Sequence, residues 1–183
     1  STLIEVNDEA ELVNAFKDNT SGRVIILKSD IQLTKPWAMV AKLENAIFDG
    51  QGHKITGLNI SSSVRGGMFE VLGNNTTVRN LNLEGAASTT AGLSVGLLAA
   101  ITKGKNIRII NSNFKSSVTG KNYVGGVVGS LDGETLIESV TVISTVNGST
   151  ITGGFAGYAE AAVTWKNIRV NSKVGGLTRL GGL

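Results

Sequence analysis

The stretch Ile109-Ile110-Asn111-Ser112-Asn113-Phe114 recurs, with altered letters, along most of the chain. The aligned copies are Val78-Arg79-Asn80-Leu81-Asn82-Leu83, Ile137-Glu138-Ser139-Val140-Thr141-Val142 and Trp165-Lys166-Asn167-Ile168-Arg169-Val170, with Ile55-Thr56-Gly57-Leu58-Asn59-Ile60 as the earliest. The first and sixth positions are apolar in every copy, which predicts that these side chains face a common core. The third position carries Asn80, Asn111, Ser139 and Asn167, with Gly57 in the earliest copy. Small polar residues at one repeated position predict a bend held by a ladder of side-chain hydrogen bonds.

Paired glycines mark the same repeat. Gly66-Gly67, Gly125-Gly126 and Gly153-Gly154, with a single Gly96 between the first two, recur every 28–30 residues (67 to 96, 96 to 126, 126 to 154). A repeat of this length, with several short strands and no helix, excludes βαβ arrays and helical solenoids. It fits a coil whose turns stack at the strand spacing of about 4.8 Å. We therefore predict an all-β fold, a single-stranded parallel β-helix of about six turns.

The predicted organisation is one β-helix domain over residues 1–183. Residues 1–22 form an N-terminal cap, with a short helix at about residues 8–19 that begins at Asn7 or Asp8. Residues 23–60 form the first coils, and residues 61–183 form the repeats with paired glycines. We expect the chain to be a fragment of a longer protein.

Composition agrees with a folded domain and removes several kinds of site. The 183 residues include 24 Gly, one Pro and no Cys, and 41% are hydrophobic, which is enough for a core. Collagen is excluded because the glycines follow no three-residue period, and the lack of Cys excludes disulfides and thiolate zinc sites. No apolar run reaches the roughly 20 residues of a membrane-spanning helix, so we expect no membrane insertion.

Two stretches resemble known repeat proteins. The run Ile47-Phe48-Asp49-Gly50-Gln51-Gly52-His53-Lys54-Ile55-Thr56-Gly57 resembles the segment that opens many pectate-lyase-like right-handed β-helices. Tyr123-Val124-Gly125-Gly126-Val127-Val128-Gly129 and Ile151-Thr152-Gly153-Gly154-Phe155-Ala156-Gly157 resemble the GLUG motif of bacterial surface proteins, including the N-terminal region of Gram-positive IgA1-specific metallopeptidases. The resemblance implies that the predicted coil is a right-handed parallel β-helix and that it belongs to a secreted or cell-surface bacterial protein. It does not imply the protease activity, because the chain has no HExxH motif and only one His.

The residues of the opening segment have a structural interpretation that we favour over a catalytic one. Asp49 is expected to cap a turn with its side chain, while Gly50 and Gly52 supply positive φ angles. His53 is the single residue that ordinarily titrates near neutral pH, and a catalytic role would require Asp49 to orient its ring toward a nucleophile. We expect these four residues to form a structural turn.

Catalysis by paired carboxylates is also disfavoured. After residue 84 the carboxylates are Asp132, Glu134, Glu138 and Glu160, and Glu138 is expected to pair with Lys166 on the next turn. We predict no catalytic residues, no metal site and no cofactor. A carbohydrate-active lyase or hydrolase remains the alternative, and it requires Asp49, His53 or Glu138 to share a groove with another carboxylate.

Aromatic and basic side chains are the candidate binding groups. Trp37, Tyr123 and Tyr158 could stack on sugar rings, although Trp37 could instead cover the open end of the first coil; Trp165 belongs to a core position. Lys103, Lys105 and Arg108, followed by Lys115 and Lys121, could form a basic patch or simply a solvated face. Aromatic residues make up 5% of the chain and do not interleave with this patch, so we expect no nucleic-acid partner.

The function predicted from these features is a non-catalytic module of an exported bacterial surface protein, acting as an adhesin, ligand-binding or spacer unit. Its expected partners are a glycan or host-surface ligand and further domains of the parent chain. A third possibility is an ice-binding solenoid, because Thr and Ser recur in the repeats, although not at one regular position.

Overall fold

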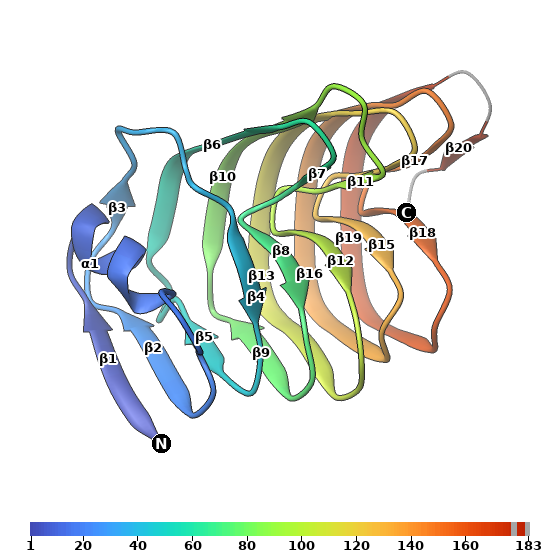
Figure 1. The fold of residues 1–183 in the computed structure, drawn as a ribbon. Coiled ribbons are helices and arrows are strands. Elements are labelled where there is room, and N and C mark those ends of the chain that lie inside the picture. The colour runs from blue at the N-terminus through green and yellow to red at the C-terminus, as the bar shows by residue number, and fades with distance from the viewer. Residues whose placement is uncertain (177–178, 182–183) are drawn as a thin grey trace.

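The chain coils into a parallel β-solenoid in the computed structural model, which describes residues 1–176 and 179–181 (Figure 1). All of the strand pairings among these residues are parallel, and each joins one turn to the next. The two smaller sheets have five strands each, so the coil completes about five three-sided turns. The predicted all-β parallel β-helix is confirmed, with about five complete turns against the six expected.

Three sheets form the sides of the solenoid. The ten-stranded sheet contains β1 (Thr2–Val6), β2 (Arg23–Leu27), β3 (Ile31–Gln32), β5 (Ile47–Asp49), β6 (Lys54–Ser62), β9 (Thr76–Arg79), β10 (Asn82–Thr89), β13 (Ile107–Thr119), β16 (Thr135–Asn147) and β19 (Val163–Gly175). One five-stranded sheet contains β7 (Arg65–Gly66), β11 (Ser94–Val95), β14 (Tyr123–Gly125), β17 (Ile151–Gly153) and β20 (Arg179–Gly181). The other contains β4 (Val40–Leu43), β8 (Phe69–Leu72), β12 (Ala99–Thr102), β15 (Val128–Leu131) and β18 (Ala156–Ala159).

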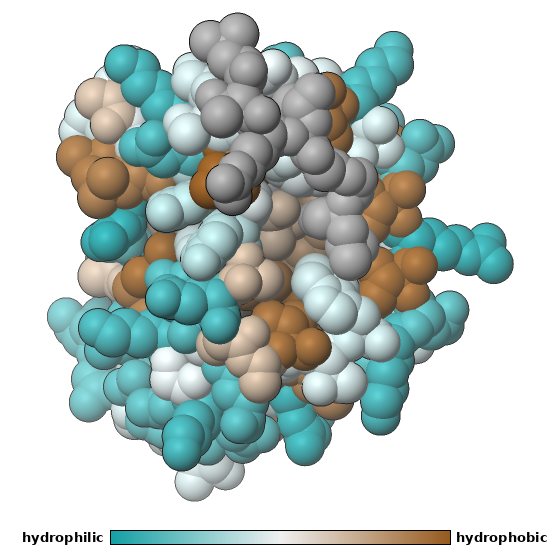
Figure 2. Space-filling model, turned by 90° about the vertical axis from the view of Figure 1, so that its right-hand side faces the viewer, coloured by the Kyte–Doolittle hydropathy of each residue, from teal (hydrophilic) through white to brown (hydrophobic). Residues whose placement is uncertain are grey.

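The core is built from columns of apolar side chains that stack from turn to turn. One column joins Phe48, Val78, Ile109, Ile137 and Trp165, and the next joins Ile55, Leu83, Phe114, Val142 and Val170. Most of these side chains are fully buried, and Trp165 is half-buried at the far end, where its ring packs edge-on against Phe155. Figure 2 looks at that end and shows hydrophobic residues between hydrophilic ones at the rim.

The predicted register of the earliest copy is wrong. Ile55 pairs with Leu83 rather than with Val78, and Ile60 pairs with Ala87 rather than with Leu83. Phe48 takes the place under Val78 instead. The cause is a turn inserted after Asp49 together with an irregularity in the β6–β10 pairing, where Gly57 adopts φ +75°.

The predicted polar column is present in the four later copies. Asn80, Asn111, Ser139 and Asn167 all have left-handed φ angles between 47° and 55°, a conformation that Asn tolerates better than most residues. The Asn111 amide donates to the Asn80 carbonyl oxygen at 2.7 Å, and the Asn167 amide reaches the Ser139 hydroxyl at 3.4 Å. This column bends each long strand, and Gly57 does not belong to it.

Glycines allow close approach at the corner between the two smaller sheets. A Cβ at Gly67 would lie 2.9 Å from the backbone of the next turn, and one at Gly96 would lie 2.6 Å from a Cα. Gly125 and Gly153 stack directly, but Gly66 stacks on Val95 rather than on a glycine. The first pair is therefore offset by one residue from the later pairs. The last residues of the predicted repeat region, 177–178 and 182–183, lie outside the described residues.

The N-terminal region covers one end of the core. Strand β1 forms the first member of the large sheet, and helix α1 (Glu9–Ala15) follows, with Asp8 as its N-cap accepting a hydrogen bond from the Glu11 amide at 2.9 Å. The helix is shorter than the predicted residues 8–19: it ends at Ala15, Phe16 leaves the helical conformation as the C-cap, and Asp18 beyond it adopts a left-handed φ of 62°. Phe16 packs into the end of the core. No helix in the described part of the chain is long and apolar enough to cross a membrane.

Candidate functional site

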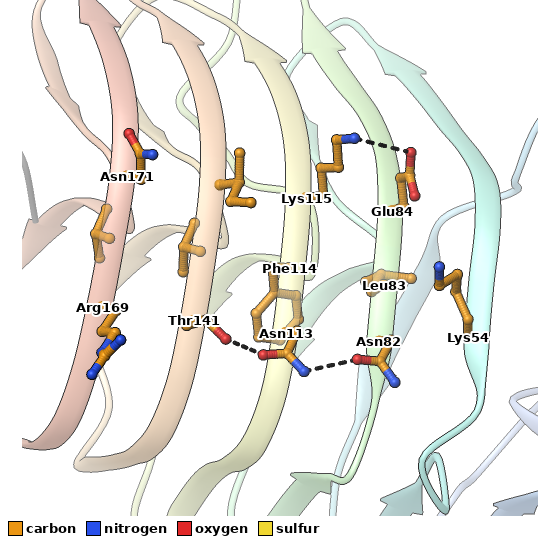
Figure 3. A pocket seen from close by; sticks show the side chains of 13 residues that line it. Lys54, Asn82, Leu83, Glu84, Asn113, Phe114, Lys115, Thr141, Arg169 and Asn171 are labelled. Carbon is orange, nitrogen blue, oxygen red and sulfur yellow. Dashed lines mark hydrogen bonds and ion pairs between the residues drawn. The ribbon is translucent and has the colours of Figure 1, made fainter.

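A groove of about 550 Å³ runs across the outer face of the large sheet (Figure 3). Its first row of side chains is contributed by one residue from each of β6, β10, β13, β16 and β19: Lys54, Asn82, Asn113, Thr141 and Arg169. A second row lies two residues further along the strands and contains Glu84, Lys115, Ile143 and Asn171. We call this surface the ladder groove, because its rows run across the strands, along the solenoid axis.

Hydrogen bonds connect the middle of the first row in one direction. The Thr141 hydroxyl donates to the Asn113 carbonyl oxygen, and the Asn113 amide donates to the Asn82 carbonyl oxygen at 2.8 Å. The Asn82 amide donates in turn to the backbone carbonyl of Gly52 at 3.0 Å. These contacts hold the polar side chains in fixed positions on a rigid sheet.

Positive charge lies at both ends of this row. Lys54 and Arg169 are exposed, and neither side chain makes an ion pair within the described residues. In the second row, the Lys115 ammonium lies 4.0 Å from a Glu84 carboxylate oxygen. The groove therefore carries three cationic side chains and one carboxylate.

Asp49 is held inside its turn, away from solvent. One of its oxygens accepts from the Gln51 amide at 2.8 Å and from the Asn80 side chain at 3.1 Å, and the other lies 2.9 Å from Arg79 Nε. Burial alone would raise the pKa of Asp49, but the hydrogen bonds from Asn80, Gln51 and Arg79 and the Arg79 charge outweigh it, so the pKa is lowered. This geometry agrees with the expected turn-capping role. The Asp49 carboxylate and the neighbouring Arg79 thus form part of the frame of the coil.

The two glycines of this turn serve different purposes. Gly52 has the expected positive φ of 81°, whereas Gly50 does not. A Cβ at Gly50 would lie 2.5 Å from the backbone carbonyl oxygen of Asn80, so only Gly fits at that position. The prediction that both glycines supply positive φ is therefore wrong for Gly50.

His53 contacts a different carboxylate from the one considered in the sequence. Its Nδ1 lies 3.1 Å from Asp30, whose carboxylate also accepts the Lys54 amide at 3.0 Å. The Lys54 amide and the His53 ring lower the pKa of Asp30. No hydrogen bond or ion pair joins His53 to Asp49 among the described residues. The orientation of His53 by Asp49 that a catalytic role would need is not observed.

The remaining carboxylates of the repeats lie apart from His53 and Asp49. Glu138 lies beside Lys166 on the next strand, as predicted. Among the described residues, however, no ion pair joins the two side chains. Asp132 accepts a hydrogen bond from the Ser130 hydroxyl at 2.5 Å, and Glu134 accepts one from the backbone amide of Asn106 at 3.4 Å. No group of three or more His, Cys, Asp or Glu in the described part of the chain could hold a metal ion.

Trp37 lies in the core beside a second hollow, of about 960 Å³, between α1 and residues 34–42. Its side chain is 8% exposed, its ring lies edge-on to Phe16, and Nε1 donates to the Met68 carbonyl oxygen at 3.0 Å. Glu9 of α1 accepts a hydrogen bond from the Thr34 hydroxyl at 2.7 Å, which connects the two sides of the hollow. Trp37 thus occupies the place described by the alternative interpretation, the open end of the first coil.

The structure brings together the other two aromatic candidates. Tyr123 of β14 and Tyr158 of β18 lie with ring centroids 5.2 Å apart and planes tilted by 30°. Tyr158 is 38% exposed and Tyr123 is half-buried. Each ring covers part of the other, so less of either face is open to a ligand than the sequence suggested.

The predicted basic patch is divided among different parts of the surface. Lys103, Lys105 and Arg108 are exposed around the turn between β12 and β13, where the Lys105 backbone amide binds the Asn74 side chain at 2.8 Å. Lys115 lies in the ladder groove, and Lys121 lies beyond the other end of β13. The 13-residue strand β13 lies between Lys103 and Lys105 at one end and Lys121 at the other, so the five side chains do not form one patch.

The ladder groove is the surface that the sequence interpretation missed. The signal was present in the fifth position of the aligned strands, which reads Asn82, Asn113, Thr141 and Arg169. The outward Thr141 stands between Asn113 and Arg169, so this row is not a regular column of threonines of the kind an ice-binding face requires.

Comparison with known proteins gives two similarities. No protein-family model matches the sequence. Halomucin from Haloquadratum walsbyi is 35% identical over 100 residues, which is 53% of this chain and 1% of halomucin, so the chain spans only a small part of that protein. A solved structure described as a putative immunoglobulin A1 protease from Bacteroides ovatus superposes with a TM-score of 0.70 and 18% identity, over 94% of this chain and 67% of the other. The chain therefore shares the β-solenoid fold of that structure.

Proposed function

We propose that this chain is a non-catalytic, ligand-binding β-solenoid module of a secreted or cell-surface protein. The observation that carries the proposal is that the groups that catalysis would need, Asp49 and His53, contact different partners and do not contact each other. Asp49 is paired with Arg79 inside a turn, and His53 meets Asp30 on the surface. A carbohydrate-active enzyme would require two of Asp49, His53 and Glu138 to act on one substrate in a shared groove.

Exposed polar side chains support the binding part of the proposal. The ladder groove presents amide, hydroxyl and cationic groups on a rigid sheet, and such groups bind glycans and other polar ligands without titrating. The similarities to halomucin and to the putative immunoglobulin A1 protease fit a surface-protein module. The paired glycines support assignment of the repeats to the GLUG type, since Gly125 and Gly153 stack in register where a side chain would collide with the next turn.

The test combines a glycan array with assays of hydrolysis and elimination on the same glycans. We expect the purified chain to bind at least one glycan and to turn over none. Turnover that His53→Ala abolishes would refute the non-catalytic assignment. Labelling of intact source cells with an antibody to the chain should also detect it outside the cell.

A further inference from the structure

We propose that the ladder groove binds one chain of an acidic polysaccharide lying along the solenoid axis. The inference rests on the proposed binding function and adds the site, the direction and the chemical class of the ligand. It begins from the two rows of side chains: the first crosses five successive strands from Lys54 to Arg169, and the second crosses four of them from Glu84 to Asn171.

The periodicity of the groove suits a linear polymer of sugar units. Equivalent side chains repeat at the strand spacing of about 4.8 Å, so the first row extends over about 19 Å in four steps. This spacing is comparable with the length of one sugar unit in an extended polysaccharide. A chain lying along the axis would therefore meet one outward side chain of the first row at about every unit.

Hydrogen-bonding capacity remains in the middle of the row. Asn113 donates one of its two amide protons to Asn82, and its carbonyl oxygen accepts from Thr141 while retaining a second lone pair. Both Asn113 and Thr141 are exposed. They can thus bind hydroxyl groups of a ligand without breaking the contacts that hold them in place.

Charge selects an acidic chain over a neutral one. Neither Lys54 nor Arg169 forms an ion pair in the part of the chain that the structure describes, and Lys115 meets Glu84 only at 4.0 Å. The Asp30 carboxylate, which accepts the Lys54 backbone amide at 3.0 Å, lies near Lys54, so Arg169 is the cation of the row that is farthest from compensation. Carboxylate or sulfate groups on the ligand would form ion pairs with Arg169 and Lys54 at the two ends and add to the contact of Lys115 near the middle. Because these cations are exposed, salt should weaken the binding.

The floor of the groove favours a saccharide over single-stranded nucleic acid. The one aromatic residue along it, Phe114, is 2% exposed and faces the core, so no ring is available to stack on a base. Ile143 is 57% exposed in the second row and offers a small apolar surface of the kind that packs against the nonpolar face of a sugar ring.

Calorimetry with the whole chain and three probes tests the proposal. Hyaluronan carries carboxylates, chondroitin sulfate carries carboxylates and sulfates on a closely related backbone, and dextran is neutral. We expect binding of one or both acidic polymers, no binding of dextran, and an affinity that falls as NaCl is raised. The two acidic probes separate recognition of carboxylate from a requirement for sulfate.

Two matched pairs of variants locate the site. Lys54→Gln combined with Arg169→Gln should raise Kd about tenfold, as expected for the loss of two exposed charge contacts. Lys103→Gln combined with Lys105→Gln removes the same charge outside the groove and should leave Kd within about twofold. Ile143→Glu and Ile143→Lys remove the same apolar contact but add opposite charges, so the first should weaken binding and the second should not.

The outcomes separate this inference from the proposed function. Equal loss of affinity in both double variants, or equal effects of the two Ile143 variants, would overturn the groove as the site. Binding to dextran as strong as to the acidic polymers would overturn the chemical class. Binding of other glycans alone would overturn the inference and leave the proposed function standing, whereas turnover without any stable binding would overturn the proposed function itself.

Discussion

Phe16 joins the N-terminal helix to the core, and its removal should detach the cap from the coil. The side chain is 3% exposed, and its ring lies edge-on to Phe48 and Phe69 with centroids 5.0 Å away in each case, and to Trp37 at 6.4 Å. Truncation of a buried Phe to Ala costs about 3–5 kcal/mol through lost transfer energy and the remaining cavity. The three edge-on contacts place Phe16 in the upper part of that range. We expect Phe16→Ala to lower the free energy of unfolding by about 4 kcal/mol.

Urea denaturation followed by circular dichroism measures this loss. The control is Val13→Ala on the same helix, because Val13 is 41% exposed and should lose less than about 1 kcal/mol. Stability in solenoids depends on contacts between neighbouring turns, so amide exchange in Phe16→Ala should also accelerate first in β1 and β2. A loss below about 1 kcal/mol, or one equal to that of Val13→Ala, would refute the assignment of Phe16 as the link between cap and core.

Three other residues give sharp tests. Asp49→Asn should lower the free energy of unfolding by about 2 kcal/mol near neutral pH, because the charged hydrogen bonds of the carboxylate are lost. The folded-state pKa of Asp49 is lowered, so its contribution to stability is present above the ordinary pKa of 3.8 and is lost as the pH falls through the folded-state pKa. Denaturation at a series of pH values should therefore show a smaller acid-induced loss of stability in the variant than in the original chain. Gly125→Ala should lower the free energy of unfolding by about 3 kcal/mol or more, since a Cβ would lie 2.7 Å from a Cα of the next turn. Gly52→Ala should lower it by only about 1 kcal/mol, because Gly52 has φ +81° but open space around it; thermal unfolding of the two variants measures the difference. Asn111→Ala should cost about 1–2 kcal/mol and Asn111→Gly less, because Gly keeps the left-handed φ while losing only the ladder hydrogen bond; equal losses in urea would contradict the strain argument.

The repeat made most of the fold predictable, because core positions and bends recur together. Asn80, Asn111 and Asn167 stood at the same position of three copies, and left-handed backbone favours Asn at such a bend. The earliest copy misled because alternation in a strand has a period of two, so residues 55–60 match the pattern of residues 78–83 as well as their true partners. Only the length of the turn after Asp49 and the irregularity near Gly57 decide the register. The sequence predicts the turn, but it does not show how far the turn and the irregularity shift the pairing.

The candidate site was less predictable, since it depends on which side chains meet across turns and sheets. Tyr123 and Tyr158 lie 35 positions apart on different sheets, and their contact follows from the corner that the glycines allow. Lys103 and Lys115 are close in sequence, but an extended strand carries them apart. The ladder groove, in contrast, could have been found by following the outward positions of the aligned strands as closely as the inward ones.

The stacking of the turns also determines how the module would respond to force. Strand β1 lies at one end of the coil and β19 near the other, so a pull between them acts along the solenoid axis (Figure 1). The hydrogen bonds between turns run parallel to that axis, and the turns are therefore loaded in series. Each turn can peel away before the next, and every release lengthens the chain and lowers the tension. Under tension along its axis, such a module on a cell surface would therefore extend in steps, one turn at a time.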